Sequence, residues 1–589
     1  MFKLLRYLIP YWWQVLILLA ATGLQVYTTL RLPALMADII NEGVVVGDTG
    51  MIWLIGGKMI LFAIISAIGS LVSSFFSAQV GAKFSRDLRR DLFNKVIHFN
   101  LADSKQFSTA SLITRTTNDV TQVRQTVTMI LNLMLRAPLF CIISFIMAIQ
   151  SAPDMTWIIA VGVVAILGVV ILIMSLIIPK FKIFQKMIDK TTLITRENLT
   201  GLRVVRAFNN EKLERKKFMR TNEDLTKLLI YIDRIMELQN PFINIIFNGT
   251  TLLCAWIGIQ LLTKDFAYLG NMIAFAQYVA HVMMSFLMLS ILFVMLPRAN
   301  VSAERINEVL KMKSKIHWPT KTNGVPDKVP SVEFKNVDFS YPDAEEKVIS
   351  GVSFVAKAGE TTAFIGSTGS GKSTLINLVP RFYETTGGDI LVDGISIRDY
   401  EKDDLMKRIG FVPQKGVLFS GTVKSNIKFG APNATDKEVR EAAEIAQATN
   451  FIEHLPDKFD AHIAQGGTNV SGGQKQRLSI ARAICKKPEI FIFDDSFSAL
   501  DMKTDAKLRA ALKPVTEGAV VLIVAQRIST IKDAEQIIVL DDGKIVGKGR
   551  HKELLLECPV YESIVKSQLS DKEFKRELEA AKKKEPRHA

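Results

Sequence analysis

Six long apolar stretches in the first 300 residues constrain the fold more strongly than any other feature of this chain. A helix needs about 20 apolar residues to cross the hydrocarbon core of a bilayer, and each stretch is long enough. The first follows an interfacial Tyr-Trp-Trp belt and has no small-residue cleavage site, so we interpret it as a retained span and not as a signal peptide. We therefore predict six membrane-spanning helices near residues 14–36, 52–80, 127–150, 155–179, 241–263 and 272–297.

The segments that connect these stretches alternate in length and in charge. The first, third and fifth connections are short and nearly free of basic residues, and they contain Glu42, Asp48, Asp154, Lys264 and Asp265. The second and fourth connections are long, polar and rich in Lys and Arg. Because basic loops stay in the cytoplasm, we expect the two long connections and both termini to be cytoplasmic, in a multi-pass protein of the cell membrane (the inner or plasma membrane).

The formal net charge of +15 at pH 7 raises the question of a nucleic-acid partner. Most of the excess lies in the two long connections, between residues 86 and 124 and between residues 180 and 220. That distribution is typical of a membrane protein with positive-inside bias, so we expect no nucleic acid to bind. The cysteines have no paired or metal-binding spacing, which predicts free, buried thiols at Cys141, Cys254, Cys485 and Cys558.

The composition changes near residue 310 to that of a soluble α/β domain. Pro319, Gly324, Pro326 and Pro330 mark a linker, and an alternating strand pattern begins at residues 332–340. Short strands and helices continue to about residue 570, and the Lys/Glu-rich tail that follows predicts a solvated helix or a frayed end. The predicted parts are a transmembrane domain (1–310), a linker (311–330), an α/β domain (331–570) and a charged tail (571–589).

Residues 366–373 match the pattern G-x-x-x-x-G-K-[ST] at every position, between an apolar strand and a helix, as this motif requires. Glycines allow backbone N–H groups to surround phosphate oxygens, and the helix N-terminus adds positive potential. Lys372 would reach the β- and γ-phosphates, and Ser373 would supply an oxygen ligand to Mg²⁺. The predicted phosphate-binding residues are Gly366, Ser367, Thr368, Gly369, Ser370, Gly371, Lys372, Ser373 and Thr374.

A second apolar strand near residues 490–493 ends in two carboxylates, Asp494 and Asp495. A carboxylate in this position completes the metal shell of phosphate-loop proteins, so we expect Asp494 and Ser373 to share a Mg²⁺ ion. The predicted fold is an α-helical transmembrane domain, with six spans and long cytoplasmic extensions, fused to an α/β P-loop NTPase cassette. Its expected cofactors are ATP and Mg²⁺.

Further short motifs in the second half of the chain resemble those of ATP-binding cassette (ABC) transporters. The sequence VSGGQ at 470–474 is similar to the family signature LSGGQ, and SALD at 498–501 looks like the D-loop. The sequence VPQ at 412–414 looks like the Q-loop, and Tyr341 resembles the aromatic residue that stacks on adenine. With six spans ahead of these motifs, nearly the whole chain resembles an exporter half-transporter with the domain order of bacterial multidrug exporters.

This resemblance implies that two cassettes enclose two ATP molecules head to tail. Each nucleotide would lie between one chain's phosphate loop and the other chain's signature, and Gln414 would act at the metal and the attacking water. The long connections resemble intracellular loops whose tips, near residues 99–106 and 204–210, dock on the cassettes, with plain solvated hairpins as the alternative. The resemblance adds the nucleotide contacts Tyr341, Ser471, Gly472, Gly473, Gln474 and Asp501.

Two positions of the hydrolytic site depart from the family pattern. Asp495 stands where the family has a catalytic Glu, so the carboxylate is one methylene shorter. A base that is about 1 Å out of place can lose on the order of 100-fold in rate. Gln526 replaces the switch histidine, and its amide can hydrogen-bond a γ-phosphate but cannot carry the charge of an imidazolium. The segment 461–467 also lacks the acidic pattern expected before the signature.

These departures, beside an intact phosphate loop and signature, resemble one subunit of a heterodimeric exporter. We hypothesise that this chain's own site binds ATP and hydrolyses it slowly, and that its signature completes an active site on a partner half-transporter. Two alternatives remain open. One is a homodimer that tolerates Asp and Gln and exports lipid or hydrophobic peptide, and the other is a regulatory subunit that ATP gates without hydrolysis.

The spans are mostly aliphatic, with Phe and Met and few ionisable residues, among them Arg31, Asp38, Arg136 and His281. Such a lining suits lipophilic or amphipathic compounds, and the resemblance implies an ATPase that drives multidrug export by alternating access. Polar groups at membrane depth face a cavity or another helix. Four methionines could form an adaptable pocket or could simply pack between helices: Met283, Met284, Met288 and Met295.

Overall fold

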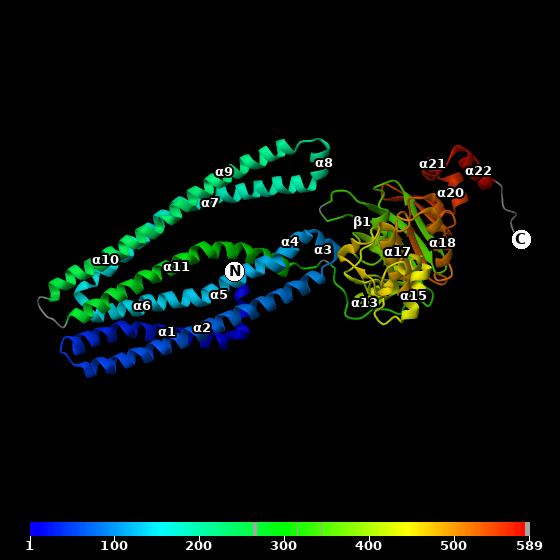
Figure 1. Ribbon diagram of the computed structural model, residues 1–589. Coiled ribbons are helices and arrows are strands. Elements are labelled where there is room, and N and C mark those ends of the chain that lie inside the picture. Colours follow the sequence, from blue (N-terminus) through cyan, green and yellow to red (C-terminus); the bar gives the residue numbers. More distant parts are fainter. Residues whose placement is uncertain (263–267, 315, 343, 583–589) are drawn as a thin grey trace. The chain divides into compact units, whose positions relative to one another are not determined.

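The computed structural model describes residues 1–262, 268–314, 316–342 and 344–582 (Figure 1). The chain divides into two compact units. The first unit comprises Met1–His98 and Thr109–Met312, and the second comprises Phe99–Ser108 and Lys313–Ala589. A short piece of the N-terminal half therefore belongs to the C-terminal unit. The predicted connection residues Lys264 and Asp265 lie outside the described residues.

The first unit is helical throughout its described part, as its apolar stretches predict. Six helical segments are long and apolar enough to cross a membrane, and each overlaps one predicted span: Lys3–Val44, Thr49–Ile97, Thr109–Ser151, Pro153–Thr200, Glu211–Gln260 and Leu269–Leu289. Its α-helices are α1 (Trp12–Asp38), α2 (Thr49–Ile97), α4 (Thr109–Thr114), α5 (Val120–Met129), α6 (Leu135–Ser151), α7 (Trp157–Thr200), α8 (Leu202–Ala207), α9 (Glu211–Glu237), α10 (Gln239–Leu262) and α11 (Tyr268–Lys311). A 3₁₀ helix, η1 (Phe2–Tyr11), precedes them, and another, η5 (Pro153–Met155), precedes α7; short π-helical turns lie at Ile39–Val44, Arg115–Asp119 and Ile130–Met134.

Several of these helices are much longer than a membrane is thick. Helix α2 has 49 residues and α7 has 44. At 1.5 Å per residue each is about 65 to 75 Å long, at least twice the hydrocarbon core. Their polar ends therefore extend beyond the membrane, which is the arrangement predicted for the long connections. In Figure 1, α7 and α9 run side by side and α8 closes the tip between them.

The helices of the first unit share an apolar core. Val26 and Leu30 of α1 are buried against Phe275 and Tyr278 of α11 in this core. The Tyr278 hydroxyl donates a hydrogen bond of 3.1 Å to the Leu30 carbonyl oxygen, so neither buried polar group is left unpaired. Met283 is also buried here, and it packs helices together instead of lining an open pocket.

The second unit is built on a six-stranded sheet with the order β12-β11-β3-β10-β9-β6. Strands β11, β3, β10, β9 and β6 run parallel, and β12 pairs antiparallel with β11 at one edge. A four-stranded sheet, β2-β1-β4-β5, and a two-stranded sheet, β7-β8, accompany it. The strands are β1 (Ser331–Phe339), β2 (Ile349–Lys357), β3 (Thr361–Gly366), β4 (Gly387–Val392), β5 (Ile395–Ser396), β6 (Ile409–Val412), β7 (Gly421–Thr422), β8 (His462–Ile463), β9 (Ile490–Asp494), β10 (Val520–Val524), β11 (Gln536–Asp541) and β12 (Lys544–Gly549).

Short helices complete the second unit. They are α3 (Leu101–Lys105), α12 (Lys372–Leu378), α13 (Lys402–Arg408), α14 (Val423–Ile427), α15 (Asp436–Ile445), α16 (Thr449–Glu453), α17 (Gly472–Cys485), α18 (Met502–Leu512), α19 (Ile528–Ile531), α20 (His551–Glu557), α21 (Pro559–Gln568) and α22 (Asp571–Lys582), with single 3₁₀ turns at Lys428–Gly430, Lys458–Asp460 and Gln465–Gly467. The parallel strands bring their carboxyl ends to one edge, where β3 leads into the phosphate loop and β9 ends in Asp494. The fold class predicted from the sequence is confirmed in both halves.

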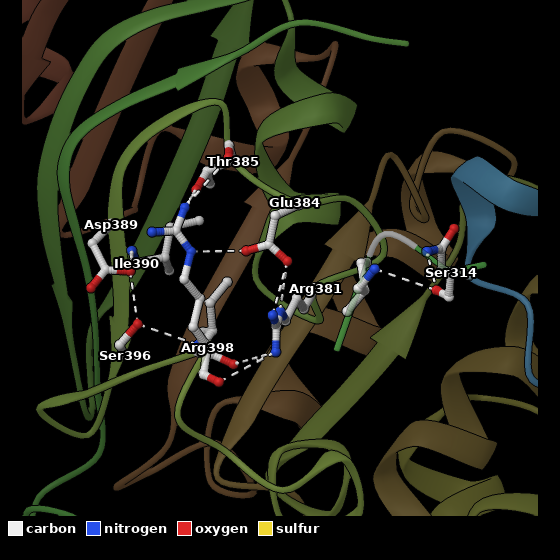
Figure 2. A network of polar contacts seen from close by, with 11 residues as sticks. Ser314, Arg381, Glu384, Thr385, Asp389, Ile390, Ser396 and Arg398 are labelled. Carbon is white, nitrogen blue, oxygen red and sulfur yellow. Dashed lines mark hydrogen bonds and ion pairs between the residues drawn. The ribbon is translucent and has the colours of Figure 1, made fainter. Parts of the chain in front are cut away.

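The first predicted tip lies on the cassette, within the second unit. Asn100 donates a hydrogen bond of 3.0 Å from its amide nitrogen to the Ser314 hydroxyl, and Ala102 packs against the core that includes β1 and β4. In the same unit, the buried Arg381 donates to Glu384 at 2.9 Å, and Arg398 donates to the same carboxylate at 2.8 Å (Figure 2). The second predicted tip, 204–210, belongs to the first unit and is exposed at Val204 and Phe208.

The C-terminal tail is more firmly attached than its composition predicts. Phe574 and Leu578 of α22 pack against the core of the second unit, and Glu577 lies 3.5 Å from the His551 ring nitrogen Nε2. Residues 571–582 therefore form a helix with no buried residue, as the expected solvated helix implies, but one apolar face of α22 packs against the core. The four cysteines are free thiols, as predicted; Cys254, Cys485 and Cys558 are also buried as predicted, whereas Cys141 is only half-buried.

Candidate functional site

The predicted phosphate loop joins β3 to α12 in the second unit. Gly369 and Gly371 have φ angles of 89° and 93°, a backbone conformation that favours glycine. At Gly371 an added Cβ atom would lie 2.6 Å from the Ile349 side chain, so the position also excludes side chains by lack of space. The N-terminus of α12 begins at Lys372 directly after the loop. The backbone thus forms the concave, helix-capped turn that binds phosphate.

Lys372 lies at the centre of this loop. Its ammonium group donates hydrogen bonds to the carbonyl oxygens of Gly366 at 3.0 Å and Ser367 at 2.6 Å, and to the Ser370 hydroxyl at 3.3 Å. Burial lowers the pKa of Lys372 from its ordinary value, although the nearby charges of Asp494 and Asp495 oppose that shift. A partly desolvated cation held by the loop is well placed to meet an anion.

Ser373 and Asp494 come together at the end of β9. The Ser373 hydroxyl donates a hydrogen bond of 2.7 Å to one Asp494 oxygen, although 121 residues separate the two in sequence. Burial raises the pKa of Asp494, and the neighbouring charge of Asp495 adds to the rise. A hydroxyl and a carboxylate are hard oxygen donors, and a divalent cation would neutralise the buried carboxylate pair, so this corner fits Mg²⁺.

The three candidate hydrolytic residues meet at a single oxygen atom. Asp495 is buried, with 6% of its surface exposed, and has a left-handed φ of 46°. Its Oδ2 atom accepts a hydrogen bond of 3.2 Å from the Gln414 amide and another of 2.9 Å from the Gln526 amide. Gln414 therefore lies on Asp495 and not on Asp494, where its predicted metal role would bring it.

Gln568 is a further residue of this region that motif analysis did not identify. Its amide nitrogen donates a 2.7 Å hydrogen bond to the Gln526 carbonyl oxygen, and its amide oxygen accepts a 2.9 Å bond from the Ile528 backbone N–H. Helix α21 thereby anchors the segment that carries Gln526. The one signal in the sequence is a polar residue near the end of an otherwise amphipathic helix, which is too weak to identify the contact.

The signature residues begin α17. Ser471 is the N-cap of this helix: its hydroxyl accepts a bond of 3.3 Å from the Gln474 backbone N–H, and the Gln474 side chain accepts one of 2.8 Å from Ser471 N–H. Gly472 and Gly473 form the first turn of α17, the end that attracts anions. In the described part of the chain, no hydrogen bond joins residues 471–474 to the phosphate loop.

Gln476 connects the signature helix to the Q-loop segment. It is 2% exposed, donates a 3.0 Å hydrogen bond to the Pro413 carbonyl oxygen and accepts a 3.1 Å bond from the Gly416 backbone N–H. These bonds hold the segment that carries Gln414 against α17. The position of Gln414 over Asp495 therefore depends on contacts with a helix about 60 residues further along the chain.

The two remaining predicted nucleotide contacts, Tyr341 and Asp501, lie in different parts of the cassette. The Tyr341 hydroxyl is 2.9 Å from the Thr374 hydroxyl of α12, and its ring makes an edge contact with Tyr383 at 5.3 Å. Asp501 is exposed and caps α18, accepting a 2.9 Å hydrogen bond from the Thr504 backbone N–H. These bonds lower the pKa of Asp501. Tyr341 is thus fixed next to the phosphate-loop helix, whereas Asp501 forms part of the cassette surface.

The comparisons with known proteins cover both units. Residues 15–286 match the ABC transporter transmembrane region, and residues 349–498 match the ABC transporter family. An uncharacterized ABC transporter ATP-binding protein of Mycobacterium tuberculosis is 38% identical over 563 residues, which are 95% of this chain and 96% of that protein. The Bacillus subtilis ABC transporter ATP-binding protein YfiB is 36% identical over 571 residues, 96% of this chain and 98% of YfiB.

Two further relatives are described by more specific names. The ATP-dependent lipid A-core flippase of Pseudomonas aeruginosa is 32% identical over 516 residues, which are 87% of this chain and 84% of the flippase. A solved structure of a bacterial Atm1-family ABC exporter with ATP bound has a TM-score of 0.78 and 22% identity, and the match covers 96% of this chain and 98% of that one. Because the sequence identity is low, that structure supports the assignment of the fold alone.

Proposed function

This chain belongs to the ABC transporter family, and from that premise we propose that it exports lipophilic or amphipathic compounds, drugs among them, as one half of a heterodimer. It is an exporter half-transporter, with the membrane domain and the ATP-binding cassette fused in one chain. As an ABC transporter it is an ATPase coupled to transport, and its cofactors are ATP and Mg²⁺. Half-transporters of this family work as dimers. The identity of the partner and of the substrate class is what we propose.

The observation that carries the heterodimer proposal is the pair of hydrogen bonds that Asp495 accepts. A general base must accept a proton from water through a free carboxylate lone pair. Here Oδ2 already accepts from both Gln414 and Gln526. Both lone pairs of that oxygen are therefore occupied. Together with the shorter side chain, these bonds favour a site that retains ATP and hydrolyses it slowly.

The residues expected to bind ATP and Mg²⁺, and those of the signature, match the family motifs. Lys372 would hold the β- and γ-phosphates, and Ser373 with Asp494 would hold Mg²⁺, which neutralises phosphate charge. The signature, from Ser471 to Gln474, begins a helix whose first-turn glycines, Gly472 and Gly473, would receive a partner's nucleotide. In this proposal the chain binds one ATP persistently and completes a second, hydrolytic site on its partner. Closure of the cassettes on ATP turns the membrane cavity outward, and hydrolysis at the partner's site resets it.

The membrane domain supports a lipophilic substrate with a polar group. The spans are apolar, but Arg136 at the start of α6 is partly buried, and its Nε atom has no hydrogen-bond partner in the described part of the chain. His281 stacks on Phe140, and Arg136 lies 6.0 Å from the same ring. Ionisable groups at this depth face a cavity or a partner helix. The second candidate function, export of a lipid by a homodimer, draws support from this cation and from the flippase relative.

We would test the proposal by tagging the chain in its native cells, purifying it in mild detergent and determining the composition of the complex. A one-to-one complex with a different half-transporter is expected. In that complex, Asp495→Asn should leave the ATPase rate almost unchanged, whereas Ser471→Arg should abolish most of it. Glu517→Gln, a surface carboxylate in the same cassette, serves as the control for Asp495→Asn.

Two results would overturn the heterodimer. The first is purification of this chain alone as an active ATPase, because both sites would then carry Asp495 and Gln526. The second is a reversed ranking, in which Asp495→Asn inactivates the complex and Ser471→Arg does not. ATP-dependent uptake of a lipophilic dye by inside-out vesicles separates a transporter from a gating subunit.

A further inference from the structure

Two helices of the first unit bring a cation and two rings together between their ends. The Phe140 ring stacks on the His281 ring with a centroid distance of 5.5 Å, and the guanidinium carbon of Arg136 lies 6.0 Å from the centre of the same Phe140 ring. Arg136 and Phe140 belong to α6, and His281 belongs to α11. We call these residues the Arg136 cluster. None of them belongs to the nucleotide site.

The helix ends place the Arg136 cluster at membrane depth. Helix α6 ends at Ser151, and a short connection leads to Trp157, an exposed residue at the start of α7 that marks one boundary of the membrane. Arg136 lies 15 residues before Ser151, about 22 Å along the helix. His281 lies 13 residues after Tyr268, the first residue of α11, about 20 Å along that helix. Both depths fall within a hydrocarbon core of about 30 Å.

The positive charge of Arg136 has no counterion in the membrane part of this chain. Arg136 forms no ion pair with a residue that the structure describes, and its buried Nε atom has no hydrogen-bond partner among those residues. The sequence has no Asp or Glu between residues 120 and 153 or between residues 266 and 303, the two stretches that contain the cluster. The other four spans also lack carboxylates at membrane depth, over residues 1–37, 49–86, 155–188 and 238–264. A second copy of this chain would therefore supply no carboxylate at this depth either.

The face of α11 next to the cluster is polar as well. Gln277, four residues before His281, is exposed, and so is Met284, three residues after it. These spacings put the three side chains on one face of the helix. Lipid acyl chains offer no partner to an amide, an imidazole or a guanidinium, so such groups face a polar ligand or another helix. An uncompensated cation beside this face calls for an anion.

We infer that the Arg136 cluster binds the anionic head group of an amphipathic substrate: a carboxylate, a sulfate or a phosphate ester. The guanidinium of Arg136 presents a planar fork of N–H donors that fits two such oxygens, and the His281 imidazole adds one N–H donor. Phe140 and Met284 would contact the apolar body of the substrate. The inference rests on the proposed export of amphipathic compounds and adds the sign of charge that the site selects. Cationic amphiphiles would be repelled.

The test uses the complex purified from native cells in mild detergent and two fluorescent probes that differ only in charge, dansylated undecanoic acid and its methyl ester. Fluorescence titration without ATP measures the affinity of each probe. Charge-assisted hydrogen bonds contribute enough for the acid to bind at least about tenfold more tightly than the ester. Arg136→Gln should abolish this preference and leave the affinity of the ester unchanged. Arg136→Lys keeps the charge and should retain most of the preference.

Lys58→Gln is the matched control, because it removes an exposed cation from another span, α2. It should leave both affinities unchanged. Equal affinities of the acid and the ester for the unmodified complex would overturn the inference, because Arg136 would then have its counterion from a partner chain. A loss of preference in Lys58→Gln as large as in Arg136→Gln would also overturn it, since the attraction would be diffuse. So would an equal fall in both affinities in Arg136→Gln, which indicates a structural role.

Competition for the bound acid identifies the source of the anion. Displacement by phosphatidylglycerol but not by phosphatidylcholine assigns the head group to a lipid, whereas displacement by octyl sulfate alone assigns it to a smaller amphiphile. Failure of the inference is distinguishable from failure of the proposed export. Export fails if inside-out vesicles take up neither probe with ATP, whatever the affinities are. The inference fails on equal affinities even where ATP drives uptake of both probes.

Discussion

The two ends of the nucleotide site differ in how closely their residues match the family motif. At the phosphate end, the loop 366–371, Lys372, Ser373 and Asp494 carry the residues that the family motif requires, and they are already hydrogen-bonded to one another. At the water end, Asp495 and Gln526 depart from the motif, and they too are hydrogen-bonded to one another. ATP binding and ATP hydrolysis are thus separable demands on one cassette. In our proposal this chain meets the first demand in full, whereas two substitutions weaken the second.

The largest expected effect tests the phosphate end. Lys372→Met removes the cation that three loop acceptors surround, and it should weaken ATP binding at this chain's own site by on the order of 100-fold. Binding of a fluorescent ATP analogue to the purified complex measures the loss. Asp495→Asn is the matched control and should bind with unchanged affinity. Equal losses in both variants would mean that the two ends are not separable.

The next effect tests the water end. Asp495→Glu with Gln526→His restores the family residues and should raise single-turnover hydrolysis at this site by about 10- to 100-fold, because the base regains its reach. Gln526→His alone should give a smaller gain, since Asp495 would still be one methylene short. An unchanged rate in the double variant would show that the slow step does not lie at these two positions.

The phosphate end could be predicted from the sequence because its contacts are local. Residues 366–373 form one turn between a strand and a helix, and the spacing of the glycines and the lysine defines the backbone that they need. The six spans could be predicted for a similar reason, since each depends on its own apolar length. The pairing of Ser373 with Asp494 is distant in sequence, and there the parallel sheet brings the two residues together.

At the water end, the sequence shows which residues depart from the family motif but not how their side chains are arranged. Nothing in the motifs shows that Gln414 and Gln526 converge on the same oxygen of Asp495, because the three residues come from three separate segments. The contact of Gln568 with Gln526 and the packing of α22 against the cassette depend on how the C-terminal helices fold back. The tail is the expected helix and has no buried residue, but charge content alone does not reveal the apolar face that packs against the cassette.

A smaller effect concerns the stability of the phosphate end. Burial raises the pKa of Asp494 above that of an unfolded chain, so the folded state is favoured when this group is protonated, and stability is lost as pH rises through the raised pKa. Asp494→Asn removes that cost and can still accept the Ser373 hydrogen bond. We expect the variant to unfold a few degrees higher at pH 7.5 in Mg²⁺-free buffer, and the difference to vanish at acidic pH. A lower midpoint at pH 7.5 would contradict this assignment.

The smallest expected effect comes from a variant that loosens the water end alone. Gln568→Ala removes the acceptor of the Ile528 backbone N–H and the donor to the Gln526 carbonyl oxygen. A hydrogen bond contributes about 1 kcal/mol, so local opening, and with it amide exchange at Ile528, should increase about fivefold. Exchange at Lys372 to Thr374 should not change, because no bond of Gln568 reaches the phosphate loop. Ser567→Ala, one residue earlier on α21, breaks only a bond to Ile564 within the helix and should leave both segments unchanged. If Gln568→Ala accelerated exchange in the phosphate loop as much as at Ile528, the two ends would open as one unit, and a weakened water end could not coexist with persistent ATP binding.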